Sequence, residues 1–433
     1  MAENISVGLL GLGTVGSGVV RIIENHQDKL MHQVGCSVDI NKVLVKDMKK
    51  ARKVKVDEGL LTSDPYEVLD NPDIDVVIEV MGGIEESRGY ILHALNNKKH
   101  VVTANKDLMA LHGTELLKAA AENECDLFYE ASVAGGIPIL RSLVEGLASD
   151  RIKKMMGIVN GTTNYILTKM SQEGRAYDDV LKEAQELGYA ESDPTADVSG
   201  LDAARKMAIM ATLGFSMNMD LDDVEHQGIE NVTEEDIKYG KQLGYTMKLI
   251  GIADRVEDKA EVSVQPAFLP EDHPLSSVHN EFNAVYVYGE AVGETMFYGP
   301  GAGELPTATA VVSDLVEVIK NKRLGVNGQS AVTPQYPKKL KESSEVFAQY
   351  FFRLHVIDEA GVLARITTLF ADEGVSFEKI LQLPLKEKGT AELVLITHTA
   401  SKSAYENIKQ RLEEADAVLN VKSVYRVEGG RES

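Results

Sequence analysis

Cysteine is scarce and tryptophan is absent in this 433-residue chain, whose only cysteines are Cys36 and Cys125. Two cysteines are too few for a disulfide framework, so we expect a reducing, cytoplasmic environment. No apolar run approaches the roughly 18 residues that a membrane-spanning helix needs. The first few residues lead directly into a strand-like apolar run, so no signal peptide is expected.

Positive charge is also in short supply, because 45 Lys and Arg residues face 67 Asp and Glu residues, giving a net charge of −22. This excess argues against nucleic acid or an anionic membrane as a general partner. The ten histidines form no ligand-spaced cluster, and no Cys/His metal pattern occurs. A hydrophobic content of 44% supports ordinary globular cores. At about 150 residues per domain, the length predicts two or three domains.

Short Val- and Ile-rich runs alternate with helical segments over residues 1–130, which predicts an α/β fold with a doubly wound parallel sheet of the Rossmann type. The expected strands are Ile5–Leu10, Ile40–Val45, Val76–Glu79, His100–Thr103 and Leu127–Tyr129. We expect the chain to return to this dinucleotide-binding domain near residues 300–320.

The rest of the chain divides into two further domains. Residues 131–320 mix long helices with alternating strand patterns and predict an α+β domain for substrate binding and dimerisation. Residues 321–348 are polar and lysine-rich and indicate a linker. A βαββαβ pattern over 349–428 predicts a ferredoxin-like module. Its strands are expected at Tyr350–Val356, Val375–Leu383, Thr390–His398 and Val418–Val427, and its helices at Val362–Asp372 and Ser401–Glu414.

A glycine fingerprint, Gly11-Leu-Gly13-Thr14-Val15-Gly16, leaves the first expected strand and opens a helix. In a dinucleotide-binding turn, Gly11 allows the tight turn, Gly13 the close approach of backbone to phosphate, and Gly16 close helix–strand packing. The helix N-terminus attracts the pyrophosphate. The alternative is a tight turn with a purely structural role.

The end of the second strand selects the cofactor, because an acid there favours NAD(H) and basic residues favour NADP(H). Lys46 comes first, Asp47 follows, and four further basic residues lie within 49–53. We predict a preference for NADP(H), with NAD(H) use left open by Asp47. A solvated basic face is the alternative.

Two lysines are candidates for proton transfer. Thr103-Ala-Asn-Lys106 follows the fourth strand, at the edge where open α/β sheets bind ligands, although Lys106 could also be a surface lysine. Asp202 and Lys206 are four residues apart and share a helix face. A capping box from Ser199 to Asp202 and an ordinary Asp202–Lys206 surface pair are the alternatives.

Motifs spread along the chain resemble the homoserine dehydrogenase family, of the single-function bacterial type with a C-terminal ACT domain. They are Gly11–Gly16, Thr103–Lys106, Glu130–Pro138, Asn160–Asn164, Gly188–Pro194, Gly200–Lys206 and Gly299–Gly303. The resemblance implies NAD(P)-dependent, reversible interconversion of L-homoserine and L-aspartate 4-semialdehyde, on the route to threonine, methionine and isoleucine. A dehydrogenase for another aspartate-family amino acid and a ligand-sensing regulatory protein are the alternative functions.

The resemblance also implies a role for individual residues. Lys206 is the expected proton donor and acceptor, and Lys106 positions substrate and cofactor. The expected substrate-binding residues are Glu191, Asp202, Tyr189, Gly161, Thr162 and Asp197. Beyond the fingerprint, the resemblance makes Lys106 and Gly303 expected cofactor contacts. Lys46 and Thr103 are expected to contact the cofactor because they lie at the ends of the second and fourth strands.

Two further sites follow from the resemblance. Glu130 and the backbone carbonyls of Val133, Gly135 and Ile137 match a monovalent-cation site, expected to hold Na⁺ or to be purely structural. The first turn of the ACT module matches an effector site for an amino acid, expected to be threonine, with dimerisation alone as the alternative role. Its residues are Asp358, Gly361, Val362 and Leu363. We expect a homodimer or homotetramer.

Overall fold

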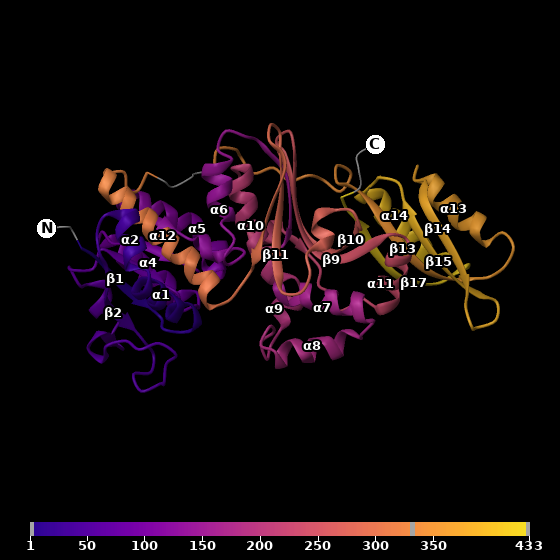
Figure 1. Ribbon diagram of the computed structural model, residues 1–433. Coiled ribbons are helices and arrows are strands. Elements are labelled where there is room, and N and C mark those ends of the chain that lie inside the picture. The colour runs from indigo at the N-terminus through magenta and orange to yellow at the C-terminus, as the bar shows by residue number, and fades with distance from the viewer. Residues whose placement is uncertain (1–3, 330–333, 430–433) are drawn as a thin grey trace. The chain divides into compact units, whose positions relative to one another are not determined.

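The computed structural model describes residues 4–329 and 334–429 and divides the chain into two compact units. Unit 1 consists of residues 1–153, 205–224 and 283–337, and unit 2 of residues 154–204, 225–282 and 338–433. Figure 1 labels the helices and strands of both. In the described part of the chain, no helix has the length and apolar character needed to cross a membrane.

Unit 1 contains a six-stranded parallel sheet in the order β3-β2-β1-β4-β5-β6. This order confirms the doubly wound Rossmann-type fold. Its strands are β1 (Ile5–Leu10), β2 (Val38–Leu44), β3 (Leu61–Thr62), β4 (Val76–Glu79), β5 (His100–Thr103) and β6 (Leu127–Phe128). The second strand lies one to two residues earlier than expected, because its register follows β1 from Ile5 onward.

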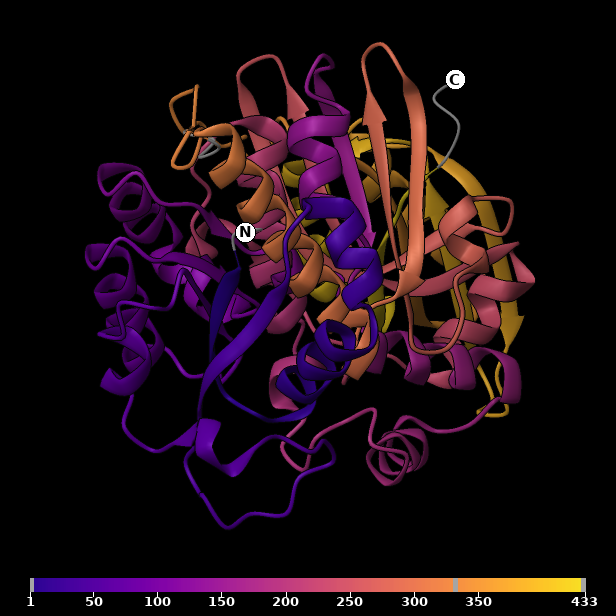
Figure 2. The same cartoon turned by 60° about the vertical axis from the view of Figure 1, so that its left-hand side comes forward.

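The helices of unit 1 flank this sheet. They are α1 (Thr14–Asn25), α2 (Gln27–Val34), α3 (Tyr66–Leu69), α4 (Glu85–Asn96), α5 (Lys106–Glu122), α6 (Ile139–Arg141) and α12 (Glu304–Leu324). Two successive strands, β11 (Phe282–Gly289) and β12 (Gly293–Pro300), precede α12. Helix α12 runs beside α1, as Figure 2 shows, and a Cβ atom at Gly18 of α1 would lie only 2.5 Å from the Glu304 carbonyl oxygen.

The expected linker begins too early, because residues 321–324 still belong to α12. Asn321 is 9% exposed, and its Nδ2 donates to Asp126 Oδ2 at 3.0 Å. Gly325, with φ of 69°, ends the helix in the left-handed conformation. The lysine-rich composition of residues 321–324 led to the prediction of a linker, although one face of this helical segment is buried. Residues 347–348, also expected in the linker, begin β13 (Phe347–Ile357), and residues 330–333 of the linker lie outside the described residues.

Unit 2 holds a mixed sheet with the strand order β7-β9-β10-β17-β13-β15-β14. These strands are β7 (Ile152–Ile158), β9 (Tyr245–Val256), β10 (Lys259–Pro270), β14 (Phe377–Pro384), β15 (Thr390–Thr397) and β17 (Val418–Val427), with β8 (Glu225–His226) and β16 (Ala400–Ser401) as short additions. The helices are α7 (Gly161–Glu173), α8 (Tyr177–Glu186), α9 (Thr195–Val198), α11 (Glu234–Gln242), α13 (Val362–Asp372) and α14 (Lys402–Glu413). Helix α10 (Leu201–Phe215) begins in unit 2 and continues in unit 1.

The C-terminal module has the expected βαββαβ order, β13-α13-β14-β15-α14-β17. Its last strand, β17, pairs in parallel with β10, so that Ala267 faces Arg426 and Phe268 faces Val427. The module therefore shares one sheet with β9 and β10.

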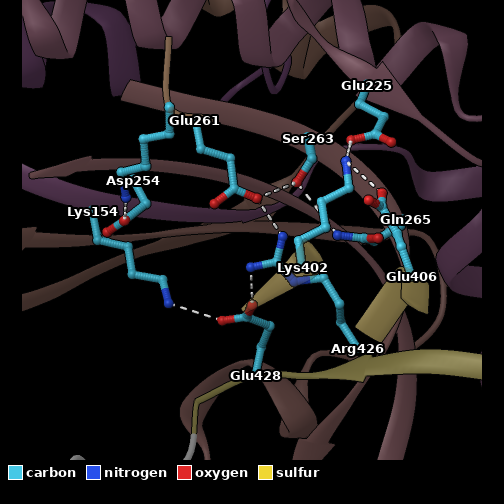
Figure 3. Close-up of polar contacts among 11 residues, drawn as sticks. Lys154, Glu225, Asp254, Glu261, Ser263, Gln265, Lys402, Glu406, Arg426 and Glu428 are labelled. Atoms are coloured by element: carbon cyan, nitrogen blue, oxygen red, sulfur yellow. Dashed lines mark hydrogen bonds and ion pairs between the residues drawn. The ribbon is translucent and has the colours of Figure 1, made fainter. Parts of the chain in front are cut away.

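A buried charge cluster accompanies this pairing, and Figure 3 shows it. Lys154 Nζ lies 2.8 Å from Glu428 Oε2, and Arg426 Nη2 lies 2.6 Å from Glu428 Oε1. Arg426 also pairs with Glu261 of β10. These contacts tie the end of β17 to β7 and β10.

Candidate active site

The glycine turn of unit 1 has the geometry of a phosphate-binding turn. Gly11 has φ of 104°, in the left-handed region that favours glycine. A Cβ atom at Gly16 would lie 2.2 Å from the Gly11 carbonyl oxygen, so only glycine lets α1 start this close to the turn. Gly13 is the N-cap residue of α1, and its missing Cβ faces open space. Thr14 and Val15 begin the helix, whose N-terminal amides can receive an anion.

The sheet edge next to this turn is organised by Glu79, which sequence reasoning missed. Glu79 is fully buried at the end of β4; its Oε1 accepts the Met81 and Gly82 amides at 3.0 and 3.1 Å. Thr103 Oγ1 donates to Glu79 Oε2 at 2.6 Å. The one available signal was a carboxylate ending an otherwise apolar buried strand. Glu79 thus fixes the loops after β4 and β5.

The basic segment after β2 lines an open cavity of about 690 Å³. Its basic lining residues are Lys49, Lys50, Arg52 and Lys55. The Arg52 guanidinium donates to the backbone carbonyl of Lys50 at 2.9 Å and to that of Asp47. Lys46 is exposed at the start of this segment and is not among the lining residues.

The two lysines lie on elements that an ion pair connects within unit 1. Lys106 is the first residue of α5, and Asn105 caps that helix by accepting the Leu108 amide at 3.1 Å. Arg205 Nη1 lies 3.1 Å from Asp107 Oδ1. The residue before Lys206 and the residue after Lys106 are therefore in contact. Gly303, with φ of 123°, is the N-cap residue of α12.

In unit 2, Asn160 gathers the carboxylates of two expected substrate-binding residues. Its Nδ2 donates to Asp197 Oδ1 at 2.7 Å and to Asp202 Oδ2 at 2.8 Å. Its Oδ1 accepts the Thr163 amide at 2.9 Å and so caps α7. Asp202 is only 5% exposed, so its carboxylate is buried. Asn160 lay in a recognised motif, but its role was not predicted.

Other expected substrate residues border this pair. Thr162 Oγ1 donates to the Tyr189 carbonyl at 2.6 Å and to Asp197 Oδ2 at 3.4 Å. The Tyr189 ring lies 5.0 Å from the Tyr165 ring, and a Cβ atom at Gly161 would lie 2.7 Å from the Glu281 carbonyl oxygen. Glu191 is exposed, and its backbone carbonyl accepts Gln185 Nε2 at 3.1 Å. These contacts bring Thr162, Tyr189, Asp197 and Asp202 together around Asn160 and leave Glu191 at the surface of unit 2.

The expected cation loop of unit 1 is buried around Glu130. Glu130 is 5% exposed, and its carboxylate accepts the amides of Leu140 and Arg141, both at 2.7 Å. Burial raises the pKa of Glu130, and these amides oppose that shift. Within the described residues, no donor contacts the carbonyls of Val133 and Gly135, whereas the Ile137 carbonyl accepts the Ile139 amide at 2.8 Å. This donor set fits a weakly held monovalent cation. The same part of the chain has no cluster of three or more His, Cys, Asp or Glu side chains suited to a metal.

The expected effector turn lies between β13 and α13. Gly361, with φ of 90°, is the N-cap residue of α13, which begins at Val362. The Asp358 amide donates to the Gly389 carbonyl at 2.8 Å, and Asp358 Oδ1 accepts Gln382 Nε2 at 3.1 Å. Leu363 is 37% exposed, so an apolar side chain is available beside the turn.

Three family profiles match the chain in succession. Residues 11–130 match the NAD-binding domain of homoserine dehydrogenase, residues 138–316 match homoserine dehydrogenase, and residues 350–417 match the ACT domain. A pyridine-nucleotide site and an ACT module are thus supported independently of the geometry.

Relatives cover almost the entire chain. The homoserine dehydrogenase of Bacillus subtilis is 66% identical over 98% of this chain and 98% of its own length. The crystal structure of a homoserine dehydrogenase from Thiobacillus denitrificans has a TM-score of 0.91 at 39% identity, covering 99% of both chains. The structure of a hyperthermophilic archaeal homoserine dehydrogenase in complex with NADPH matches 74% of this chain and 98% of its own chain, at 26% identity and a TM-score of 0.63. The chain therefore belongs to the homoserine dehydrogenase family.

Proposed function

We propose that the chain interconverts L-homoserine and L-aspartate 4-semialdehyde with NADP(H). The observation that carries this proposal is that Asn160 holds the carboxylates of Asp197 and Asp202 by hydrogen bonds. Asp202 lies on α10, one helical turn before Lys206. The direct test is NADPH oxidation by the purified protein with L-aspartate 4-semialdehyde, and the reverse reaction with L-homoserine. Turnover of other aspartate-family substrates in preference to these two would contradict it.

Lys206 is the proposed proton acceptor for the homoserine hydroxyl. The nicotinamide supplies hydride chemistry when it is bound, and loss of hydride from C4 requires simultaneous loss of the hydroxyl proton. A second ammonium nearby lowers the proton affinity of a lysine, and the Arg205–Asp107 ion pair supports placing Lys106 in that role. Asp202, Asp197 and Glu191 are proposed to bind the α-ammonium, with Gly161, Thr162 and Tyr189 beside them.

The proposed preference for NADP(H) is supported by the basic cavity after β2. It is also supported by the NADPH complex of the archaeal relative. The proposed contacts are Lys46 at the adenosine ribose, the glycine turn with Thr14 and Val15 at the pyrophosphate, and Thr103, Lys106 and Gly303 near the nicotinamide end. Lys46→Ala should lower the NADP/NAD ratio of kcat/KM. An unchanged ratio would contradict the assignment of Lys46.

The effector proposal places threonine at Asp358, Gly361, Val362 and Leu363 of a homodimer or homotetramer. The exposed Leu363 and the glycine N-cap support a small amino-acid ligand. Calorimetry with threonine on the full chain and on Asp358→Ala tests it. Equal heats in both proteins would remove the site from this turn.

The cation proposal places Na⁺ at Glu130, Val133, Gly135 and Ile137. The two backbone carbonyls without a donor in the described chain support it. Thermal unfolding in NaCl and in tetramethylammonium chloride at equal ionic strength is the test, and identical Tm values would make the loop purely structural.

A further inference from the structure

Lys248 is a lysine that none of the proposed roles uses. It lies on β9 and is 1% exposed, and burial lowers its pKa to about 7. Within the described residues, no carboxylate forms an ion pair with it. A buried ammonium without a carboxylate is costly, because desolvation is not compensated by an opposite charge.

The hydrogen bonds of Lys248 fix the orientation of one amide. Lys248 Nζ donates to Asn164 Oδ1 at 3.1 Å and also to the Val278 carbonyl. Asn164 Nδ2 in turn donates to the carbonyls of Val278, Asn280 and Phe282, at 3.2, 2.8 and 3.1 Å. An amide has one acceptor end and one donor end. By holding the acceptor end, Lys248 turns the donor end toward segment 278–282.

This segment supports the turn that carries Asn160. Asn164 lies in the first turn of α7, which Asn160 caps while also holding Asp197 and Asp202. Gly161 lies so close to the Glu281 carbonyl that a Cβ atom would be 2.7 Å from it. His279 and Glu281 are the titratable residues of this segment, and the pKa of His279 is lowered by burial and then by the charge of Lys248.

We propose that Lys248 is a positioning residue for substrate binding. Its ammonium orients the Asn164 amide, the amide holds segment 278–282, and that segment supports the Asn160–Asn164 turn. This inference rests on the proposed role of that turn in binding homoserine. Removing Lys248 should therefore weaken substrate binding without affecting the cofactor, which is assigned to unit 1.

Lys99 provides a matched control. It is 4% exposed, its Nζ donates to the carbonyls of Asn71 and Ile74, the latter at 2.9 Å, and burial lowers its pKa as well. It immediately precedes β5, at the sheet edge opposite the cofactor turn. Lys99→Met thus removes the same kind of buried, carbonyl-bound ammonium away from the proposed site.

Steady-state kinetics of Lys248→Met and Lys99→Met decide the proposal, with the wild-type activity established first. The loss of one oriented hydrogen bond predicts a roughly tenfold rise in KM for L-homoserine in Lys248→Met. The KM for NADP⁺ should stay near the wild-type value in both variants, as should the homoserine KM of Lys99→Met. If Lys248 were purely structural, Lys248→Met and Lys99→Met would both have a lowered Tm, and their KM values for L-homoserine and NADP⁺ would be unchanged. That result would overturn the proposal.

A conservative variant keeps the test decisive if Lys248→Met does not fold. Lys248→Gln retains an N–H donor and should give a homoserine KM between the wild-type and fully disrupted values. Equal rises in the KM values for L-homoserine and NADP⁺ in folded Lys248→Gln would assign the lysine to general stability and overturn the proposal.

Discussion

At the scale of single residues, the proposed chemistry depends on one turn of α10. Asp202 and Lys206 are four residues apart on this helix, and Asn160 holds the Asp202 carboxylate by a 2.8 Å hydrogen bond. A buried carboxylate fixed in this way is oriented before any ligand arrives, which lowers the cost of binding an ammonium group.

Lys206→Ala should lose roughly 10²–10⁴ in kcat, the usual contribution of a positioned general base. The KM for NADP⁺ should be unaffected, because the glycine turn is intact. Lys182→Ala, on α8 and outside every proposed role, is the control and should keep wild-type turnover. Near-normal kcat in Lys206→Ala with intact cofactor binding would contradict the assignment.

Lys248 should also contribute to the pH dependence of the free energy of unfolding. Burial lowers its folded-state pKa to about 7, against 10.5 for the ordinary side chain. Between these pH values the unfolded chain binds more protons, so the stability of the wild type rises with pH. The free energy of unfolding of the wild type, relative to that of Lys248→Met, should rise by about 1.4 kcal/mol per pH unit.

Urea unfolding of both proteins at several pH values from 7 to 10 measures this difference. Parallel pH profiles for wild type and Lys248→Met would show that Lys248 does not titrate in this range.

At the scale of secondary-structure elements, the pairing of β10 with β17 attaches the ACT module. Glu428 is 5% exposed and bonded to Lys154 and Arg426. Burial raises the pKa of Glu428, but the two cations outweigh it and hold the value at about 2, against an ordinary 4.5.

Glu428→Gln should lower the free energy of unfolding at neutral pH by about 3 kcal/mol, because it takes their shared carboxylate from the buried Arg426 and the half-buried Lys154. The folded-state pKa is depressed, so the stabilisation is complete above about pH 4.5 and is lost as pH falls toward 2. Chemical unfolding of both proteins at pH 7, 4 and 3 should therefore show a gap that closes in acid.

Glu406→Gln is the matched control for this prediction. Glu406 is exposed on α14 and lies 4.0 Å from Lys402, so its loss should change stability by less than about 1 kcal/mol. Equal effects of the two substitutions on the free energy of unfolding would show that the burial of Glu428 in its charge cluster does not contribute to stability.

At the scale of the whole molecule, the ACT module packs directly against the rest of unit 2. Phe268 of β10 packs against Phe351 and Tyr425 of the module, with ring centroids 4.7 and 5.7 Å apart. A chain ending at residue 344 would expose these rings and the edge of β10 together.

Such a truncated chain should aggregate or unfold at a markedly lower temperature than the full chain. Light scattering and thermal unfolding measure this outcome. A monodisperse truncated protein with the Tm of the full chain would show that the shared sheet contributes little to the stability of unit 2.

Local sequence patterns were sufficient for most of the architecture. Ile5–Leu10, Val76–Glu79, His100–Thr103 and Val362–Asp372 have the expected bounds, because alternation, apolar runs and glycine positions act within a few residues. The glycine fingerprint also predicted its turn, since Gly11 and Gly16 meet each other over five residues.

Only the tertiary structure revealed the hydrogen bonds of Glu79, Asn160 and Lys248, and the pairing of β17 with β10. Each depends on partners from distant stretches of chain, so neither periodicity nor motif spacing encodes it. The sequence by itself determined most of the elements, the glycine turn and the family resemblance, because these rest on local geometry and on residue identity. The structure decided which polar groups are buried together, because desolvation and hydrogen bonding act through space rather than along the chain.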